Sequence, residues 1–280
     1  RTAWSRVESH IDTLTATPDA VDELRQTILQ LAVQGRLTEQ TPEDEPAEET
    51  VERSKMEIQR LYNDGKITRP SKRPEVQEEE KIFDAPTGWA WIRLGNVLAP
   101  VNGRAFKKEE LLKSGTPVIR IQNLGGGGSW YYSDMQLDEK KYCEEEDLLY
   151  AWSGTFGPYI WNGPRAIFHY HIWRIELTEA LNKRFAYYLL KAISVDIEEG
   201  AHGIMLPHMT KGGMEKHVVP LPPLEEQKRI AETMDQLMTL CDQLMARLER
   251  SRATGEQWVE STLGETSLMR EASAGVGQHV

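Results

Sequence analysis

Residues 219–251 read V-P-L-P-P-L-E-E-Q-K-R-I-A-E-T-M-D-Q-L-M-T-L-C-D-Q-L-M-A-R-L-E-R-S, and this stretch decides how the rest of the chain is interpreted. Its prolines at 220, 222 and 223 force an extended entry, because proline fixes φ and disfavours helix at the preceding residue. From Leu224 the sequence predicts one long helix that nothing breaks before Gly255. Six apolar residues, here called the seam, recur along it at alternating spacings of four and three: Ile230, Met234, Leu237, Cys241, Leu244 and Leu248.

The seam has the a/d periodicity of a coiled coil, whose apolar stripe faces another helix. A helix of this length is long for the core of one domain, so the pattern indicates a spacer or a docking surface. The alternative is an amphipathic helix that lies on its own domain. Two partners for the seam are open: a second copy of the chain, which is favoured, or the N-terminal helix around Val21–Leu31 folded back on it.

Three motifs together resemble the specificity subunits of type I restriction–modification enzymes. The run P-L-P-P-L-E-E-Q-K-R-I-A, followed by a heptad helix, is similar to the conserved helical region of those subunits. Val21–Leu37, V-D-E-L-R-Q-T-I-L-Q-L-A-V-Q-G-R-L, is similar to their opening helix, and residues 86–94, P-T-G-W-A-W-I-R-L, to the start of a target-recognition domain. The resemblance covers most of residues 20–250, although the domain between the helical motifs matches in outline only.

Length and composition allow one large or two small domains, because the chain has 280 residues and 39% of them are hydrophobic. No apolar run reaches the roughly 18 residues of a transmembrane helix, and the first residues lack the apolar region of a signal peptide. We therefore expect no membrane association. Cys143 and Cys241 lie far apart in the sequence, which argues against a disulfide framework and fits a reducing cytoplasm.

The net charge of −11 argues against a simple nucleic-acid-binding protein, but the charge is unevenly distributed. Residues 86–224 carry 15 Lys+Arg and 15 Asp+Glu, so the acidic excess lies entirely in the flanking regions. A neutral middle domain can still have a basic face, so the charge pattern permits DNA binding without demonstrating it.

Local signals predict an α/β fold: a mixed-sheet target-recognition domain with flanking helices and a long C-terminal coiled-coil helix. Thr17 caps a helix that begins at Pro18 and stops at Gly35, and a second helix over 47–64 ends at Gly65. Asn182 caps a third helix. Strands are expected over Trp89–Leu94, Pro117–Ile121, Leu148–Trp152, Ala166–Leu177 and His217–Leu221. Strands with so few helices between them favour a mixed sheet over a doubly wound one.

These signals divide the chain into four regions. Residues 1–85 form an N-terminal helical region and a charged linker, and residues 86–222 the DNA target-recognition domain. Residues 223–263 are the conserved coiled-coil helix, and residues 264–280 are expected to be a disordered tail, because they are small and polar.

Motifs of catalysis are mostly absent. The sequence has no G-x-x-x-x-G-K-[ST] phosphate loop, no [DN]-P-P-[YF] loop of amino-methyltransferases and no glycine-rich dinucleotide fingerprint. His169 and His171 could form half of a metal site, but no third ligand follows at a recognised spacing, so we expect them on one face of a strand and expect no metal.

Loops of the middle domain combine cations, amides and aromatic rings. Arginine reads guanine and amides read adenine in the major groove, whereas lysines contact phosphates. The candidate DNA-binding residues are Arg104, Lys107, Lys108, Arg120, Gln122, Asn123, Tyr131, Trp152, Arg165 and Lys211, with His202 a weaker one. The alternative for the lysines is an ordinary solvated loop, and for Trp152 a place in the core.

The resemblance implies a non-catalytic subunit that reads half of a bipartite double-stranded DNA target. It implies docking of methyltransferase (M) subunits through the conserved helix and, through them, of restriction (R) subunits. S-adenosylmethionine, ATP and magnesium would belong to those partners, and this chain would hold no cofactor. Complete subunits of the family have two recognition units, whereas this sequence shows one. Two alternatives stay open: a standalone DNA-modifying enzyme, or a coiled-coil adaptor that does not touch DNA.

Overall fold

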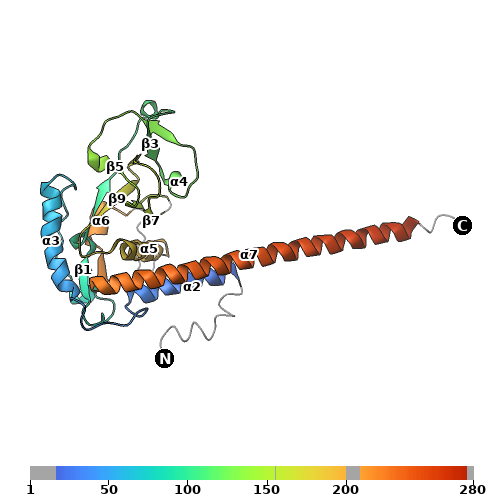
Figure 1. Ribbon diagram of the computed structural model, residues 1–280, viewed down its shortest axis with the longest axis horizontal. Coiled ribbons are helices and arrows are strands. Elements are labelled where there is room, and N and C mark those ends of the chain that lie inside the picture. Colours follow the sequence, from blue (N-terminus) through green and yellow to red (C-terminus); the bar gives the residue numbers. More distant parts are fainter. Residues whose placement is uncertain (1–16, 155, 200–208, 276–280) are drawn as a thin grey trace. The chain divides into compact units, whose positions relative to one another are not determined.

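The structure is a computed structural model that describes residues 17–154, 156–199 and 209–275 (Figure 1). His202 lies outside the described residues, as do the first 16 residues of the predicted N-terminal region. The described residues form two compact units: those between 29 and 234 are the larger, and residues 17–28 with 235–275 are the smaller. No helix in the described part has both the length and the apolar character needed to cross a membrane.

The elements alternate between short strands and helices along the chain. The α-helices are α2 (Pro18–Val33), α3 (Ala47–Asn63), α4 (Ile121–Leu124), α5 (Lys183–Glu199), α6 (Lys211–Lys216) and α7 (Leu224–Gly275). The 3-10 helices are η1 (Glu78–Glu80), η2 (Leu94–Asn96), η3 (Lys108–Glu110) and η4 (Glu139–Lys141). The strands are β1 (Ala90–Arg93), β2 (Leu98–Asn102), β3 (Thr116–Ile119), β4 (Tyr131–Ser133), β5 (Tyr142–Cys143), β6 (Leu148–Ala151), β7 (Gly157–Ile160), β8 (Ala166–Phe168), β9 (Ile172–Leu177) and β10 (Val218–Leu221).

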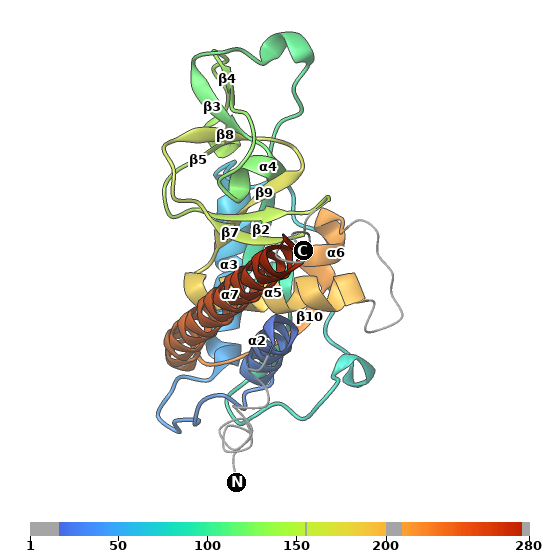
Figure 2. The same ribbon diagram turned by 90° about the vertical axis from the view of Figure 1, so that its right-hand side faces the viewer.

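The larger unit contains three small sheets, and the expected α/β fold with a mixed sheet is confirmed. One sheet has the order β2-β9-β6-β7 with antiparallel neighbours, and a second has the order β4-β3-β8-β5, in which β3 and β8 run parallel. β1 and β10 form a separate antiparallel pair. Figure 2 shows the β4-β3-β8-β5 sheet at one end, the β2-β9-β6-β7 sheet next to it, and α5 beyond.

The core between the two four-stranded sheets is made of apolar residues from both. It consists of Ile119, Cys143, Leu149, Trp161, Ala166, Phe168 and Ile172, each at most 6% exposed. On the α5 side, Tyr150 stacks on Trp173 with ring centroids 5.9 Å apart and shares a hydrogen bond of 3.0 Å with Ser194. The buried cysteine is therefore part of the packing, and both cysteines of the chain are free thiols.

The prediction of one long strand over Ala166–Leu177 was wrong. The segment is two strands, β8 and β9, which belong to different sheets. The chain turns at 169–171, where the backbone N–H of Ile172 donates to the carbonyl of His169 at 2.9 Å. His169 and His171 therefore lie on a turn between the sheets and not on one face of a strand. Period-2 alternation cannot detect this change, because the residues on both sides of the turn are apolar and β-forming.

Helix boundaries follow the local signals closely at the N-terminal ends. Thr17 Oγ1 accepts from the N–H of Ala20 at 3.2 Å, and Asn182 Oδ1 accepts from the N–H of Phe185 at 3.0 Å, as predicted. Gly35 ends α2 with a φ of +66°. Helix α7 continues through the boundary predicted at residue 264 to Gly275, and residues 276–280 of the predicted tail lie outside the described residues.

The boundary predicted at residue 86 does not separate two bodies. Ile58 of α3 packs with Ile67, Ala99 and Val101 in one cluster, so the helix before the boundary covers a strand after it. The charged linker is also docked, because Arg93 pairs with Glu80 at 2.6 Å and donates to the carbonyl of Pro74 at 3.1 Å. The larger unit therefore includes this N-terminal segment.

Buried polar side chains fix the start of α7. Trp89 Nε1 donates to Glu226 Oε2 at 2.9 Å, and Glu226 Oε1 accepts from Gln40 at 3.0 Å. The neighbouring Gln227 is fully buried; its amide donates to the carbonyls of Ala180 and Pro222 at 2.9 and 3.0 Å, and accepts from the N–H of Asn182 at 2.8 Å. The adjacent Glu226 and Gln227 are therefore explained by bonds that join α7 to three distant segments.

The seam is buried along its first two thirds. Ile230 and Met234 are fully buried in the larger unit, whereas Leu237 and Cys241 are 8% and 2% exposed in the smaller one. There the first part of α2 lies beside α7 (Figures 1 and 2), and Arg25 pairs with Asp242 at 2.6 Å. The folded-back helix thus covers this part of the seam within a single chain. Self-pairing, which the sequence favoured, is not needed to bury it.

Replacing Trp89 with Phe removes the indole N–H from the buried Glu226 carboxylate and should lower the free energy of unfolding by about 1–3 kcal/mol. Urea unfolding measures the loss. Trp91→Phe is the control, because the Trp91 ring packs edge-on against Phe83, 5.0 Å between centroids. Equal losses in the two variants would show that the Glu226 bond contributes nothing beyond ring volume.

Leu237→Glu should destabilise the smaller unit by about 3 kcal/mol or more, because a charge is placed at a buried position. Leu240→Glu, at a site 52% exposed, should be nearly neutral. Thermal unfolding measures both, and sedimentation equilibrium determines the oligomeric state. A dimer that Leu237→Glu dissociates without lowering the melting temperature would show that the seam is covered by a second copy instead.

Candidate nucleic-acid interface

The ends of two parallel strands place an arginine and a histidine side by side. β3 and β8 pair in register through Val118 with Ile167 and Ile119 with Phe168, so Arg120 and His169 follow at the same edge. The N–H of His169 donates to the carbonyl of Ile119 at 2.9 Å. This edge of the sheet therefore brings a predicted DNA contact beside a histidine that the sequence had assigned to a strand face.

The side chain of Arg120 is held in one orientation. Its guanidinium carbon lies 4.3 Å from the centre of the Tyr131 ring, and Nη2 donates to the carbonyl of Ser129 at 2.7 Å. Nη2 carries a second hydrogen, and a guanidinium has five donors in all. Nε is buried without a hydrogen-bond partner, so the donors left for a ligand are those on the two Nη atoms. The predicted pair Arg120 and Tyr131 thus forms one preorganised group.

The two amides after Arg120 differ in availability. Asn123 is 2% exposed; its side chain accepts from the N–H of Arg120 at 3.0 Å and donates to the carbonyl of Gly127 at 3.1 Å. These bonds give Asn123 a structural role as the third residue of α4, whose side chain bonds back to the N-cap residue Arg120, so its burial argues against the predicted contact with a base. Gln122 is exposed and lies against Gly128, so its amide stays a candidate.

The turn between β8 and β9 carries an aromatic cluster. Tyr170 is 40% exposed, and its ring centroid lies 3.8 Å from that of His171 and 6.0 Å from that of Trp152. Trp152 stacks on Trp173 at 5.8 Å and donates through Nε1 to the carbonyl of Tyr170 at 2.8 Å. The predicted residue Trp152 is half-buried and supports the turn, whereas Tyr170 at its tip was not predicted.

The loop that precedes β3 carries the predicted cations Arg104, Lys107 and Lys108. Arg104 pairs with Glu110 at 3.0 Å and lies over the ring of Phe106, and this guanidinium holds the pKa of Glu110 below its usual value. Lys107 and Lys108 are exposed. Arg104 therefore orders the loop, and the two lysines present their charge to solvent.

The predicted contacts Arg165 and Lys211 lie elsewhere and are ion-paired. Arg165 pairs with Glu139 and Glu144 at 2.8 and 2.5 Å, and stacks over Tyr142. Lys211 hydrogen-bonds Thr68 and lies 3.4 Å from Glu215, whose side chain is 1% exposed. Neither residue lies in the cluster around Arg120. Because carboxylates already offset both charges, the structure argues against a phosphate contact at either residue.

The electrostatic environment keeps the turn uncharged. Burial, His171 and the Arg120 cation together lower the pKa of His169 to about 4, and burial lowers the pKa of His171. Both imidazoles are therefore neutral at pH 7 and act as hydrogen-bonding groups. No group of three or more His, Cys, Asp or Glu side chains within the described ranges is arranged to hold a metal ion.

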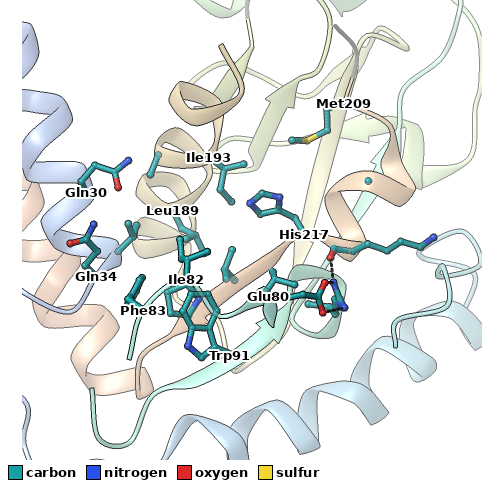
Figure 3. A pocket seen from close by; sticks show the side chains of 18 residues that line it. Gln30, Gln34, Glu80, Ile82, Phe83, Trp91, Leu189, Ile193, Met209 and His217 are labelled. Carbon is teal, nitrogen blue, oxygen red and sulfur yellow. Dashed lines mark hydrogen bonds and ion pairs between the residues drawn. The ribbon is translucent and has the colours of Figure 1, made fainter. Parts of the chain in front are cut away.

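A separate pocket of about 380 Å³ opens in the larger unit, away from these residues. Figure 3 shows the amides of Gln30 and Gln34 from α2 on one side and His217 on the other, with Phe83 beside Trp91. Leu189 and Ile193 of α5 also line it. None of the residues predicted to contact DNA lines this pocket.

Comparison with known proteins gives one consistent result. Residues 86–251 match the family described as "Type I restriction modification DNA specificity domain". The specificity subunit of the type I restriction enzyme EcoAI from Escherichia coli is 32% identical over 90% of this chain and 45% of its own length. That of EcoEI, from the same organism, is 26% identical over 90% of this chain and 46% of its own length.

The chain thus spans about half the length of the curated relatives it matches. A solved structure concerned with complex assembly and conformational transition of the type I R-M system contains a chain of similar fold. The TM-score is 0.57 and the identity 17%, and the match covers 94% of this chain and 59% of that chain. This structural likeness supports the fold alone.

The lowered pKa of His169 predicts a pH dependence of stability. The unfolded chain binds a proton near pH 6.5, whereas folded His169 binds it only near pH 4. The stability that the folded state gains by keeping His169 neutral is therefore complete above pH 6.5, and it is lost as the pH falls towards 4. His169→Gln should lose less free energy of unfolding than the wild type between about pH 7 and pH 5 in urea titrations. Parallel losses in the two proteins would contradict this.

Proposed function

Because this chain belongs to the family of type I restriction–modification DNA specificity domains, we propose that it reads one part of a bipartite double-stranded DNA target and catalyses no reaction itself. The family resemblance found in the sequence is confirmed by the match over residues 86–251. Since the chain spans about half the length of its curated relatives, one recognition unit corresponds to one part of a target.

The observation that carries this proposal is the group formed by Arg120 and Tyr131 at the edge of the β4-β3-β8-β5 sheet. A guanidinium clamped by a ring and by the Ser129 carbonyl loses little entropy when it binds. Its free donors suit the O6 and N7 acceptors of guanine in the major groove. Lys107 and Lys108 supply phosphate contacts from the loop before β3.

The partners follow from the family. We propose that methyltransferase subunits dock on α7 and bring restriction subunits with them, and that S-adenosylmethionine, ATP and magnesium are held by those partners. Leu244 and Leu248, at the far end of the seam, are partly exposed and lie in the same helix. We include in this proposal that two copies of the chain can associate with each other through this end of α7. A standalone enzyme, in contrast, would transfer a methyl group from labelled S-adenosylmethionine to DNA without any partner.

Selection of bound duplexes from a random library tests the function. The wild-type chain should enrich a short motif, and Arg120→Ala should lose about 1–3 kcal/mol of affinity for that motif with little loss on random DNA. Equal losses on both would make Arg120 a backbone contact. Failure of the wild type to enrich any motif, alone and with its methyltransferase, would overturn the proposed function.

Replacing both Lys107 and Lys108 with Ala should weaken binding to all sequences. The slope of log K against log salt should shrink by about one to two units, because each phosphate contact contributes about 0.9. Lys55→Ala with Lys228→Ala is the matched control, since these lysines pair with Glu52 and Glu225 on helices outside the cluster. An unchanged slope in the first variant would remove both lysines from the interface.

A further inference from the structure

Tyr170 is a large aromatic residue left exposed at the tip of a well-ordered turn. It is 40% exposed, whereas the neighbouring aromatic residues Phe168 and Trp173 are at most 2% exposed. Exposed rings at such positions are typical of binding surfaces, where an apolar face and a polar tip both find contacts. The fold does not require a tyrosine here, because the ring lies outside the core.

The backbone of the turn is fixed by its own hydrogen bonds. The N–H of Tyr170 donates to the carbonyl of Arg104 at 3.0 Å, and its carbonyl accepts from Trp152 Nε1 at 2.8 Å. The carbonyl of His171 accepts from the N–H of Trp152 at 3.1 Å. The turn is therefore a rigid support whose side chains, and not its backbone, are available to a ligand.

Chemistry at the turn suits bases better than phosphates. His169 and His171 are neutral at pH 7, because burial lowers both of their pKa values. Nδ1 of His169 faces the N–H of His171 at 3.5 Å, an orientation that leaves Nε2 as the N–H donor of the neutral ring. Without a full charge the turn gains little from a phosphate, but its donors and the Tyr170 hydroxyl can bond to base edges.

We propose that the turn His169–Tyr170–His171 contacts base edges next to Arg120 and determines which bases this domain selects. The inference rests on the proposed function and adds three residues to the recognition surface. Arg120 and His169 lie at the ends of adjacent strands, so their donors reach neighbouring positions of one groove. Hydrogen-bond donors on Arg120 and His169 pair with acceptors, and guanine presents two acceptors, O6 and N7, in the major groove.

A protein partner is the competing occupant of an exposed aromatic residue. DNA is favoured because the Tyr170 backbone bonds directly to that of Arg104, which opens the loop carrying the exposed Lys107 and Lys108. Tyr170 is thus bonded to the start of the cationic loop and follows His169, which lies at the strand end beside Arg120. An aromatic tip bordered by cations on two sides suits a base-and-phosphate surface.

The test compares the motif enriched from a random duplex library by the full chain and by its variants. Tyr170→Ala and His169→Ala should weaken binding to the wild-type motif roughly ten- to hundredfold and lose preference at one or two adjacent positions. Binding to random DNA and its salt dependence should stay unchanged. Tyr62→Ala on α3 is the matched control, because Tyr62 is also exposed, at 38%. Tyr170→Phe keeps the ring and its packing, so it reports on the hydroxyl even where the Ala variant is less stable.

The outcomes separate this inference from the proposed function. If the wild-type chain enriches no motif, both the proposed function and this inference are overturned. A wild type that enriches a motif which the Tyr170 and His169 variants bind equally well overturns only the role of the turn. A uniform loss on all sequences, with a smaller salt slope, makes the turn a phosphate contact and also overturns it. Loss of methyltransferase binding with unchanged DNA selection assigns Tyr170 to the protein partner instead.

Discussion

The buried carboxylate of Glu226 and the buried amide of Gln227 are the constraint on which the larger unit depends. Removing such polar groups from water is costly unless each is hydrogen-bonded, and here their partners come from segments far apart in the sequence. Trp89 and Gln40 hold Glu226, whereas Asn182 and Ala180 bond to Gln227. These hydrogen bonds fix the position of the start of α7 relative to the rest of the larger unit.

The same bonds account for the polar side chains in the interior of the larger unit. Under the proposed function, a recognition surface needs a reproducible orientation on the unit that carries it. Arg229, on the same helix α7, adds an ion pair of 2.5 Å with Asp44. Packing alone would allow α7 to slide or rotate, whereas directional bonds specify one register.

The sheet edge that carries Arg120 and His169 depends on a different constraint, the parallel pairing of β3 and β8. Parallel strands end at the same edge, so two residues almost fifty positions apart, Arg120 and His169, become neighbours. Positive charge in the domain is largely offset by local carboxylates, as at Arg104 and Arg165. Under the proposed function, an acidic protein can therefore offer cations to DNA at one place, through a clamped arginine and a lysine-bearing loop, without a basic surface overall.

The sequence by itself determined the family, the long seam helix, the caps at Thr17 and Asn182, and the candidate residues Arg120 and Tyr131, because these depend on signals within a few residues. It did not determine that α2 covers Leu237 and Cys241, since periodicity identifies an apolar stripe but not its partner. The sequence pattern also predicted β8 and β9 as one strand, so the exposed Tyr170 at the turn between them was not predicted. Only the tertiary structure decided which loops meet, because strand pairing and buried hydrogen bonds link residues whose separation in sequence carries no local signal.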